Sequence, residues 1–408
     1  MFGRRFVFGQ IRGCPELRAS KGVRLRNRSE GPSVRRVRKE DLMLFSQRVV
    51  GSVLVIMLVM LGMPAAFALT PEEAVGLIAT RLDQSQIKEG PDSGLWSLEG
   101  AFLGPIASGL ACAYEWTEDP AYRACADLAG GWILDTAVAQ GNLLGDEAYA
   151  LVRLSKISDD PNHNVWQNAL VDFYLSPRKH HNESSTEEYL LAFDGLEPST
   201  AVFYLAHHLV GADYVQDQDT EVYRRALLSH LSRVDDNASF PVMAVGVATW
   251  ALTVTDTPVD SPITSYELPA NPRWEGLTVG DLPAILASHQ VPEGEPFAGS
   301  FYWRLDHTDG ETGGVAAGYT EDTVFGALGL VAVASEDSDG ADEAVIAAQT
   351  ALLEGIDEDG YVYQHLTRQG DAYNTFAGEV LQALWSIEEY LGRDAADDVE
   401  AGVVGESE

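Results

Sequence analysis

Hydrophobic residues between positions 70 and 391 recur at intervals of three and four, the spacing that gathers side chains on one face of an α-helix. Strand signals are confined to two short aromatic pieces, 301–303 and 361–363. Caps and helix breakers divide the region into helices expected near 70–82, 95–116, 120–139, 145–157, 161–175, 197–212, 218–235, 239–253, 280–289, 319–335, 339–355 and 373–391. The sequence therefore predicts an all-α domain with two short aromatic strands in loops.

The predicted helices alternate between two kinds of surface. Those in even positions along the chain carry few charges, and the segment 239–253 has none. Those in odd positions are amphipathic, as in 120–135. A helix that is apolar all round must be buried, whereas an amphipathic helix has one face for the core and one for water. Six such pairs fit a closed ring, with six inner helices around an axis and six outer helices facing solvent.

This pattern resembles the (α/α)6 toroid families, which are the terpenoid-cyclase-like proteins and the six-hairpin glycosidases and polysaccharide lyases. The resemblance is carried by GPIASGLACAYEWTEDPAYRACADLAGGWIL, which has the form of an inner helix, a tight turn and an outer helix, and by two similar units at 299–330 and 359–384. It covers residues 70–391 and implies an (α/α)6 toroid of about twelve helices. The sequence has neither the acid motif of the squalene cyclases nor the zinc ligands of the protein prenyltransferases, so carbohydrate-active relatives are favoured.

The N-terminal region has the composition of an export signal. Residues 49–69 contain no charge, and a basic stretch at 4–39 precedes them. The small residues that end at Ala68 form a signal-peptidase pattern, so we expect cleavage there, with a retained membrane anchor as the alternative. The predicted organisation is a basic extension with a mis-assigned start at 1–42, a signal peptide or anchor at 43–68, a toroid at 69–392 and an acidic disordered tail at 393–408. The expected location is secreted or periplasmic.

The charge distribution limits the partners of the exported part. The chain has a net charge of −35, and the first 68 residues hold 13 of its 27 basic residues but 4 of its 62 acidic ones. Such an acidic domain repels nucleic acid and anionic membranes, so a membrane contact is expected only through the N-terminal segment. The same field disfavours uronate polymers, which leaves a neutral glycan as the expected ligand.

Two cysteines lie in the exported part, Cys112 and Cys125. They are equally far from the turn between two predicted antiparallel helices, and therefore at the same height on the hairpin. In an oxidising compartment this spacing predicts a disulfide. Two small buried thiols are the alternative.

Long connections precede most of the inner helices, which places a functional mouth at the N-terminal ends of those helices. Hydrolysis of a glycosidic bond needs two carboxyl groups, one as an acid and one as a nucleophile or base, and aromatic side chains stack on sugar rings. The candidate catalytic residues are Asp306, His307, Glu321 and Asp322. The candidate substrate contacts are Trp96, Glu99, Trp303, Tyr319, His365 and Tyr373.

These residues leave three functions open. The first is a glycoside hydrolase. The second is a polysaccharide lyase, with His307 or His365 as base and Tyr319 or Tyr373 as acid. The third is a non-catalytic binding or scaffold protein of the envelope, whose axis would be plugged by side chains such as Phe203, Phe325 and Trp385.

No metal site and no cofactor are expected. Two acidic turns, at 337–340 and 357–362, have the composition of the middle of a calcium loop, but Leu366 stands where the second loop would need its bidentate glutamate. Acidic turns are therefore the interpretation of both segments, with calcium as the alternative.

Overall fold

The computed structural model describes residues 69–96, 102–141, 143–159, 164–175, 198–210, 217–238, 240–265, 269–308, 316–334 and 341–403. The chain divides into two units, Met1–Phe67 and Ala68–Glu408, and every described residue belongs to the second. The predicted leader lies outside the described residues. Among the residues that are described, no helix is long and apolar enough to cross a membrane.

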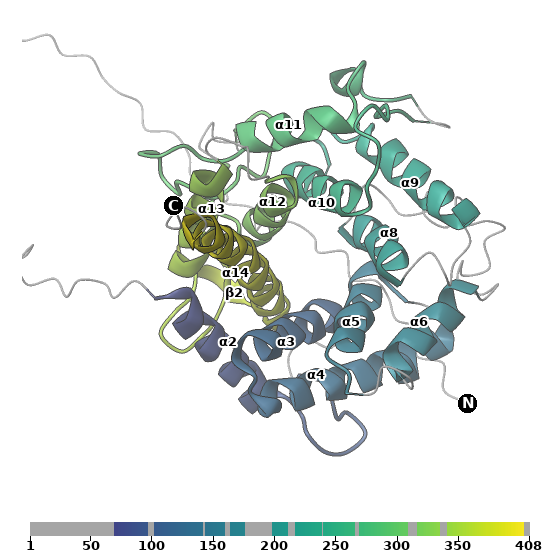
Figure 1. Ribbon diagram of the computed structural model, residues 1–408, viewed down its shortest axis with the longest axis vertical. Helices are drawn as coiled ribbons and strands as arrows, with labels where there is room; N and C mark the ends of the chain where they lie inside the picture. The colour runs from purple at the N-terminus through teal and green to yellow at the C-terminus, as the bar shows by residue number, and fades with distance from the viewer. Residues whose placement is uncertain are drawn as a thin grey trace, which may run out of the picture. The chain divides into compact units, whose positions relative to one another are not determined.

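The described residues form twelve α-helices in two concentric sets (Figure 1). Each inner helix contacts the next, and the last closes onto the first. The inner helices are α3 (Leu103–Thr117), α5 (Gly145–Lys156), α8 (Pro198–Val210), α10 (Pro241–Val254), α12 (Thr320–Val333) and α14 (Asn374–Val403). The outer helices are α2 (Pro71–Ser85), α4 (Pro120–Ile133), α6 (Val165–Leu175), α9 (Asp217–Leu231), α11 (Leu282–Ser288) and α13 (Ala341–Glu354). The predicted (α/α)6 toroid is confirmed, with the expected helices inside.

Short elements decorate this ring. A π-helical turn, η1 (Leu134–Val138), extends α4, and the 3-10 turns η2 (Pro272–Trp274) and η3 (Val279–Asp281) precede α11. The strands β1 (Tyr363–His365) and β2 (Gln369–Ala372) form an antiparallel hairpin before α14. The predicted strand at 301–303 forms only single bridges, from Phe301 to Gln290 and from Tyr302 to Ala317.

Glycines allow the inner helices to approach closely. A Cβ atom on Gly109 of α3 would lie 2.2 Å from the carbonyl oxygen of Gly378 in α14. A Cβ atom on Gly378 would lie 2.3 Å from the carbonyl oxygen of Pro105. Since real Cβ contacts are not this short, α3 and α14 are in backbone contact, and the ring closes at a point where only glycine fits.

The helix starts follow local capping rules. Thr70 and Glu73 form a capping box at the start of α2, each side chain accepting a hydrogen bond from the other residue's backbone N–H. The Asp119 carboxylate accepts from the N–H of Ala121 at the start of α4, where Pro120 occupies the first turn.

The predicted disulfide is wrong, because Cys112 and Cys125 are free thiols. Both are buried, and their charged neighbours differ. The thiol of Cys112 lies beside Arg153 of α5, whereas that of Cys125 lies beside Lys88, which follows α2. The equal distance from the turn places the cysteines at the same height but does not fix the face of each helix.

Two further segments differ from expectation. Helix α14 continues to Val403, so much of the expected tail at 393–408 is helical, in keeping with the alanines and glutamate it contains. The long 255–281 connection after α10 is a surface insertion that packs against the turn between α9 and α10. In it the indole N–H of Trp274 donates to the carbonyl oxygen of Val234, and the N–H of Asn271 donates to that of Ser232.

Candidate active site

Acidic side chains gather where the inner helices begin. Asp146 lies in the first turn of α5, Glu321 and Asp322 in the first turn of α12, and Glu379 in the second turn of α14. The starts of α3 and α5 also meet here, because a Cβ atom on Gly104 would lie 2.3 Å from the backbone of Asp146. The predicted mouth therefore carries carboxylates from three inner helices.

A small cavity lies on the axis beneath this group. Its volume is about 10 Å³, enough for one water molecule. Its polar wall contains Asp146 and Glu379 together with Ser108 and Gln382, and the Ser108 hydroxyl donates to the side-chain oxygen of Gln382 at 3.1 Å. Apolar and aromatic residues complete the lining: Pro105, Tyr149, Val202, Trp250, Val324, Phe325 and Leu328.

These carboxyl groups differ in how readily they ionise. Burial, with the nearby charge of Asp146, raises the pKa of Glu321 to about 7, although its side chain keeps partial exposure. Burial and the charges of Glu321 and Asp146 raise the pKa of Glu379 well above its usual range. Glu379 is 7% exposed, and its Oε2 has no hydrogen-bond partner within the described part of the chain. Burial therefore favours the protonated form of both Glu321 and Glu379.

Two neighbouring acids have structural contacts. Asp322, predicted as catalytic, is 3% exposed and lies close to the N–H of Met243 in the first turn of α10, which favours its ionised form. Glu147 accepts from the N–H of Leu144 at 2.9 Å and so caps the start of α5. Burial raises the pKa of Asp322 well above its usual range and that of Glu147 to about 7.

An aromatic group borders Glu321. The ring of Tyr319 meets the edge of Trp303 at 6.2 Å and of His365 at 5.2 Å. His365 Nε2 donates to the carbonyl oxygen of Ala317 at 3.1 Å, and its Nδ1 accepts from the backbone N–H of Thr367 at 3.2 Å. This arrangement fixes a neutral His365, whose pKa burial lowers. The structure thus brings together three predicted substrate contacts.

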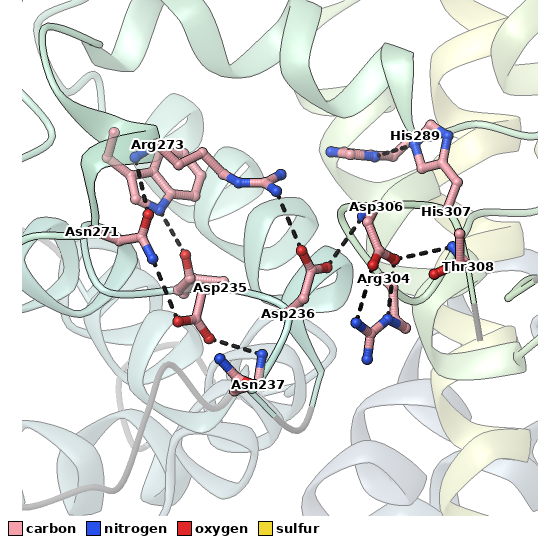
Figure 2. Close-up of polar contacts among 12 residues, drawn as sticks. Asp235, Asp236, Asn237, Asn271, Arg273, His289, Arg304, Asp306, His307 and Thr308 are labelled. Carbon is pink, nitrogen blue, oxygen red and sulfur yellow. Dashed lines mark hydrogen bonds and ion pairs between the residues drawn. The ribbon is translucent and has the colours of Figure 1, made fainter. Parts of the chain in front are cut away.

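A second polar group lies on the loop between α11 and α12 (Figure 2). His289 Nδ1 and His307 Nε2 are 2.8 Å apart, so one ring donates and the other accepts. Tyr302 stacks on His307 with the ring centroids 4.0 Å apart. Burial lowers the pKa of His289 to about 4 and also lowers that of His307.

Asp306 makes several hydrogen bonds that hold this loop in place. Its carboxylate accepts two hydrogen bonds from Arg304, both at 3.1 Å, and one from the N–H of Thr308 at 3.0 Å. Its own N–H donates to Asp236, which also pairs with Arg273 of the 255–281 insertion at 3.2 Å (Figure 2). These donors hold the pKa of Asp306 well below its usual range. A carboxylate bound in this way is a poor proton donor.

Other predicted residues lie apart from the acids. Trp96 is 3% exposed and its indole N–H donates to the carbonyl oxygen of Leu82, so the tryptophan is a buried packing residue. Glu99 lies outside the described residues. Tyr373 packs against Phe376 and donates to Asp371.

Two residues expected to plug the axis also pack elsewhere. Phe203 packs among Tyr174, Phe173 and Tyr223 of the outer helices, and Trp385 stacks under the guanidinium of Arg153. Of the three expected plugs, only Phe325 lines the axial cavity.

Sequence reasoning missed Glu379 and His289. Glu379 was detectable as a lone charge in an apolar inner helix, since 375–387 contains no other. His289 had no such signal. Asp146 is at the end of the ring where sequence analysis places the mouth.

The described residues contain no cluster of three or more side chains that could hold a metal ion. In the second acidic turn, Asp357 Oδ1 accepts from the N–H groups of Asp359 and Tyr361, and Oδ2 accepts from the Tyr363 hydroxyl. The Asp357 carboxylate is thus occupied by hydrogen bonds within the turn. The first acidic turn, at 337–340, lies outside the described residues.

Known proteins resemble this chain in fold. No model of a protein family matches the sequence, and the comparison with curated proteins found no match. Among solved structures, an unsaturated glucuronyl hydrolase specific for heparin aligns over 78% of this chain and 96% of its own, with 11% identity and a TM-score of 0.54. An unsaturated glucuronyl hydrolase from Bacillus sp. GL1 aligns over 77% and 95%, with 16% identity and a TM-score of 0.47. At such identities the likeness shows the toroid fold alone.

Proposed function

We propose that this protein is an exported glycoside hydrolase that acts, at the N-terminal ends of its inner helices, on a glycan without acidic groups. The observation that carries the proposal is the grouping of three carboxyl groups from three inner helices: Asp146 and Glu379 line one axial cavity, and the charge of Glu321 acts on Glu379. Glycoside hydrolysis needs one protonated and one ionised carboxyl group on either side of the scissile bond.

The roles follow from the environments. Glu321 has a pKa of about 7 and partial exposure, which suits a general acid that protonates the leaving oxygen at neutral pH. Asp146 also keeps partial exposure, and its carboxyl group would act as the base for water or as the nucleophile. The rings of Trp303 and Tyr319, next to Glu321, would support the sugar.

Charge selects the class of substrate. The similar heparin-specific enzyme is named for a glucuronyl group. Here a carboxylated sugar would meet Asp146 and Glu379 in a domain that is itself strongly acidic, and like charges at short range repel. A glycan without acidic groups avoids that repulsion.

The test is hydrolysis by the full chain of a panel of neutral, basic and uronate-containing oligosaccharides, followed by the release of reducing ends. We expect Asp146→Asn and Glu321→Gln each to lower kcat by about 10²–10⁴-fold. Glu147→Gln is the matched control, because it removes an acid from the same turn of α5 as Asp146 but leaves an oxygen to accept the bond from Leu144. Equal activity in all four proteins would refute the assignment.

The size of the cavity favours a second candidate, a binding protein without catalysis. A volume of about 10 Å³ holds one water molecule and no sugar ring, so a substrate must bind above it. Saturable binding of a glycan with no release of reducing ends would support this second function.

A further inference from the structure

The axial cavity combines two kinds of wall. One carries the carboxylates of Asp146 and Glu379, and the other carries the aromatic rings of Tyr149, Trp250 and Phe325. Tyr149 and Trp250 meet edge to face with their centroids 5.3 Å apart. Carboxylates and aromatic faces are the two surfaces that attract an ammonium group, the first by charge and the second through the negative face of the ring.

Glu379 supplies an unsatisfied acceptor in this cavity. It is 93% buried, being 7% exposed, and its Oε2 has no hydrogen-bond partner among the described residues. A buried polar atom without a partner is rare and destabilising, and in a native structure it calls for an occupant, either a water molecule or a bound group. In its ionised form the carboxylate only accepts hydrogen bonds, so an occupant that favours ionisation must be a donor.

We propose that the axial cavity receives the free ammonium group of an amino sugar, with Glu379 and Asp146 as its acceptors and Tyr149 and Trp250 as its aromatic wall. An ammonium group is a compact cation with three donors and no acceptor, and it is about the size of the water molecule that the cavity would hold. This inference rests on the proposed function for its sugar and names the substrate class of the same site.

Other occupants fit less well. A carboxylate would add a further negative charge beside Glu379 and Asp146. A methyl group would leave Glu379 Oε2 without a donor. A hydroxyl would give that oxygen a hydrogen bond but would not offset the charge. Calcium takes six to eight oxygen ligands, whereas no cluster of three metal-binding side chains is found in the described residues.

Asp146 lies both at the cavity and at the mouth. This residue lines the cavity and yet keeps partial exposure, and Glu321, also partly exposed, is close enough for its charge to act on Glu379. A sugar bound above the cavity could therefore place its amino group inside while its ring stays at the mouth.

Binding should also release a proton. The charges of Glu321 and Asp146, together with burial, hold the pKa of Glu379 well above its usual range, so a bound cation opposes this effect and favours the ionised form. A neutral ligand lacks that effect.

The experiment is calorimetric titration of the full chain at pH 6.5 with three trisaccharides: glucosamine with free amines, its fully N-acetylated counterpart, and the corresponding glucose oligomer. We expect the free amine to bind about tenfold more tightly than either of the others. Titration in two buffers of different ionisation enthalpy should show proton release with the amine alone. Equal affinity for all three ligands would overturn the inference.

Two variants test whether Glu379 is responsible for the preference for the free amine. Glu379→Gln should reduce the preference for the amine to about twofold or less, whereas Glu147→Gln, outside the cavity, should leave it unchanged. An unchanged preference in Glu379→Gln would overturn the assignment to this cavity. If that variant does not fold, the comparison of ligands on the unaltered chain still decides.

The two proposals fail separately. Hydrolysis of neutral oligosaccharides with no preference for a free amine would leave the proposed function standing and refute the ammonium site. Preferential binding of the free amine with no release of reducing ends would support the ammonium site and refute the hydrolase.

Discussion

Asp322 in α12 lies close to the backbone N–H of Met243 in α10, and this N–H favours the ionised form of the carboxyl group. Helix α10 has Phe240 as its own N-cap residue, which makes no side-chain hydrogen bond to the first turn. The carboxyl group of a neighbouring inner helix thus lies near a donor that a serine or aspartate would normally satisfy from within the chain. The contact joins the starts of two adjacent inner helices at the mouth.

Replacing Asp322 tests this contact. Asp322→Ala removes the carboxyl group that lies near the N–H of Met243, so we expect a loss of about 1–3 kcal/mol in the free energy of unfolding, measured by urea denaturation. Asp322→Asn keeps an oxygen near this N–H and should lose less. Equal stability of the alanine variant and the wild type would contradict a stabilising contact between the two helix starts.

The closing point of the ring gives a second test. Gly378→Ala would bring a Cβ atom within 2.3 Å of the Pro105 carbonyl oxygen and force α3 and α14 apart. We expect a loss of about 1–3 kcal/mol or more.

Gly131→Ala in α4 is the matched control. It is also a helical glycine, but no atom lies within 4 Å of its added Cβ, so alanine should stabilise the helix by about 0.5–1 kcal/mol. Urea denaturation of the two variants should give changes of opposite sign. Similar stabilities would show that α3 and α14 do not need glycine where they cross.

The fold was predictable because its signal is repeated along the chain. Most inner helices carry few charges, as in α10, although α5 is an exception, and the outer helices are mostly amphipathic, so the same pattern recurs along the chain. The disulfide was not predictable in this way. It depended on a single pair, Cys112 and Cys125, and on the rotation of two helices about their own axes, which hairpin spacing does not determine.

The site was predictable only in part, for a similar reason. Sequence placed Asp146 and Glu321 at one end of the ring, because that follows from the order of the helices. It could not show that Asp306 pairs with Arg304 while Glu379, far along the chain, lines the axis. Which carboxylate stays protonated depends on burial and on neighbours brought together by ring closure.

The two buried thiols give a third prediction. After unfolding without reductant, peptides that contain Cys112 and Cys125 should both be alkylated, whereas alkylation of the folded protein should be slow because both side chains are buried. Reductant should leave the Tm unchanged. A cross-linked peptide that joins the two residues would show the disulfide instead.

The paired histidines give a fourth. The imidazole of His289 should titrate near pH 4, well below an exposed histidine, because burial and the neighbouring His307 both oppose its protonation. NMR of isotopically labelled histidine side chains measures this pKa. In His307→Asn the pKa of His289 should rise but stay below 6.5, since burial is the larger cause. A titration of His289 near 6.5 in the wild type would contradict the contact.

The capping acid of α5 gives a fifth prediction, in the pH dependence of stability. The pKa of Glu147 is about 7 in the folded protein against an ordinary value of 4.5, so the folded form binds this proton more tightly than the unfolded chain does. Between about pH 4.5 and 7 the folded state therefore loses stability relative to the unfolded state as pH rises, because the unfolded chain has already released this proton.

Glu147→Gln removes this contribution. Its Tm relative to the wild type should become more favourable as the pH rises from 5 to 8. Glu293→Gln, which changes an exposed acid on the loop between α11 and α12, serves as the control and should show no such trend. The comparison with wild type at each pH is needed because the lowered pKa of His289 acts in the opposite sense, adding stability as pH rises from about 4 to 6.5. A Tm difference for Glu147→Gln that is constant across this range would mean that the carboxyl group is not buried at the start of α5.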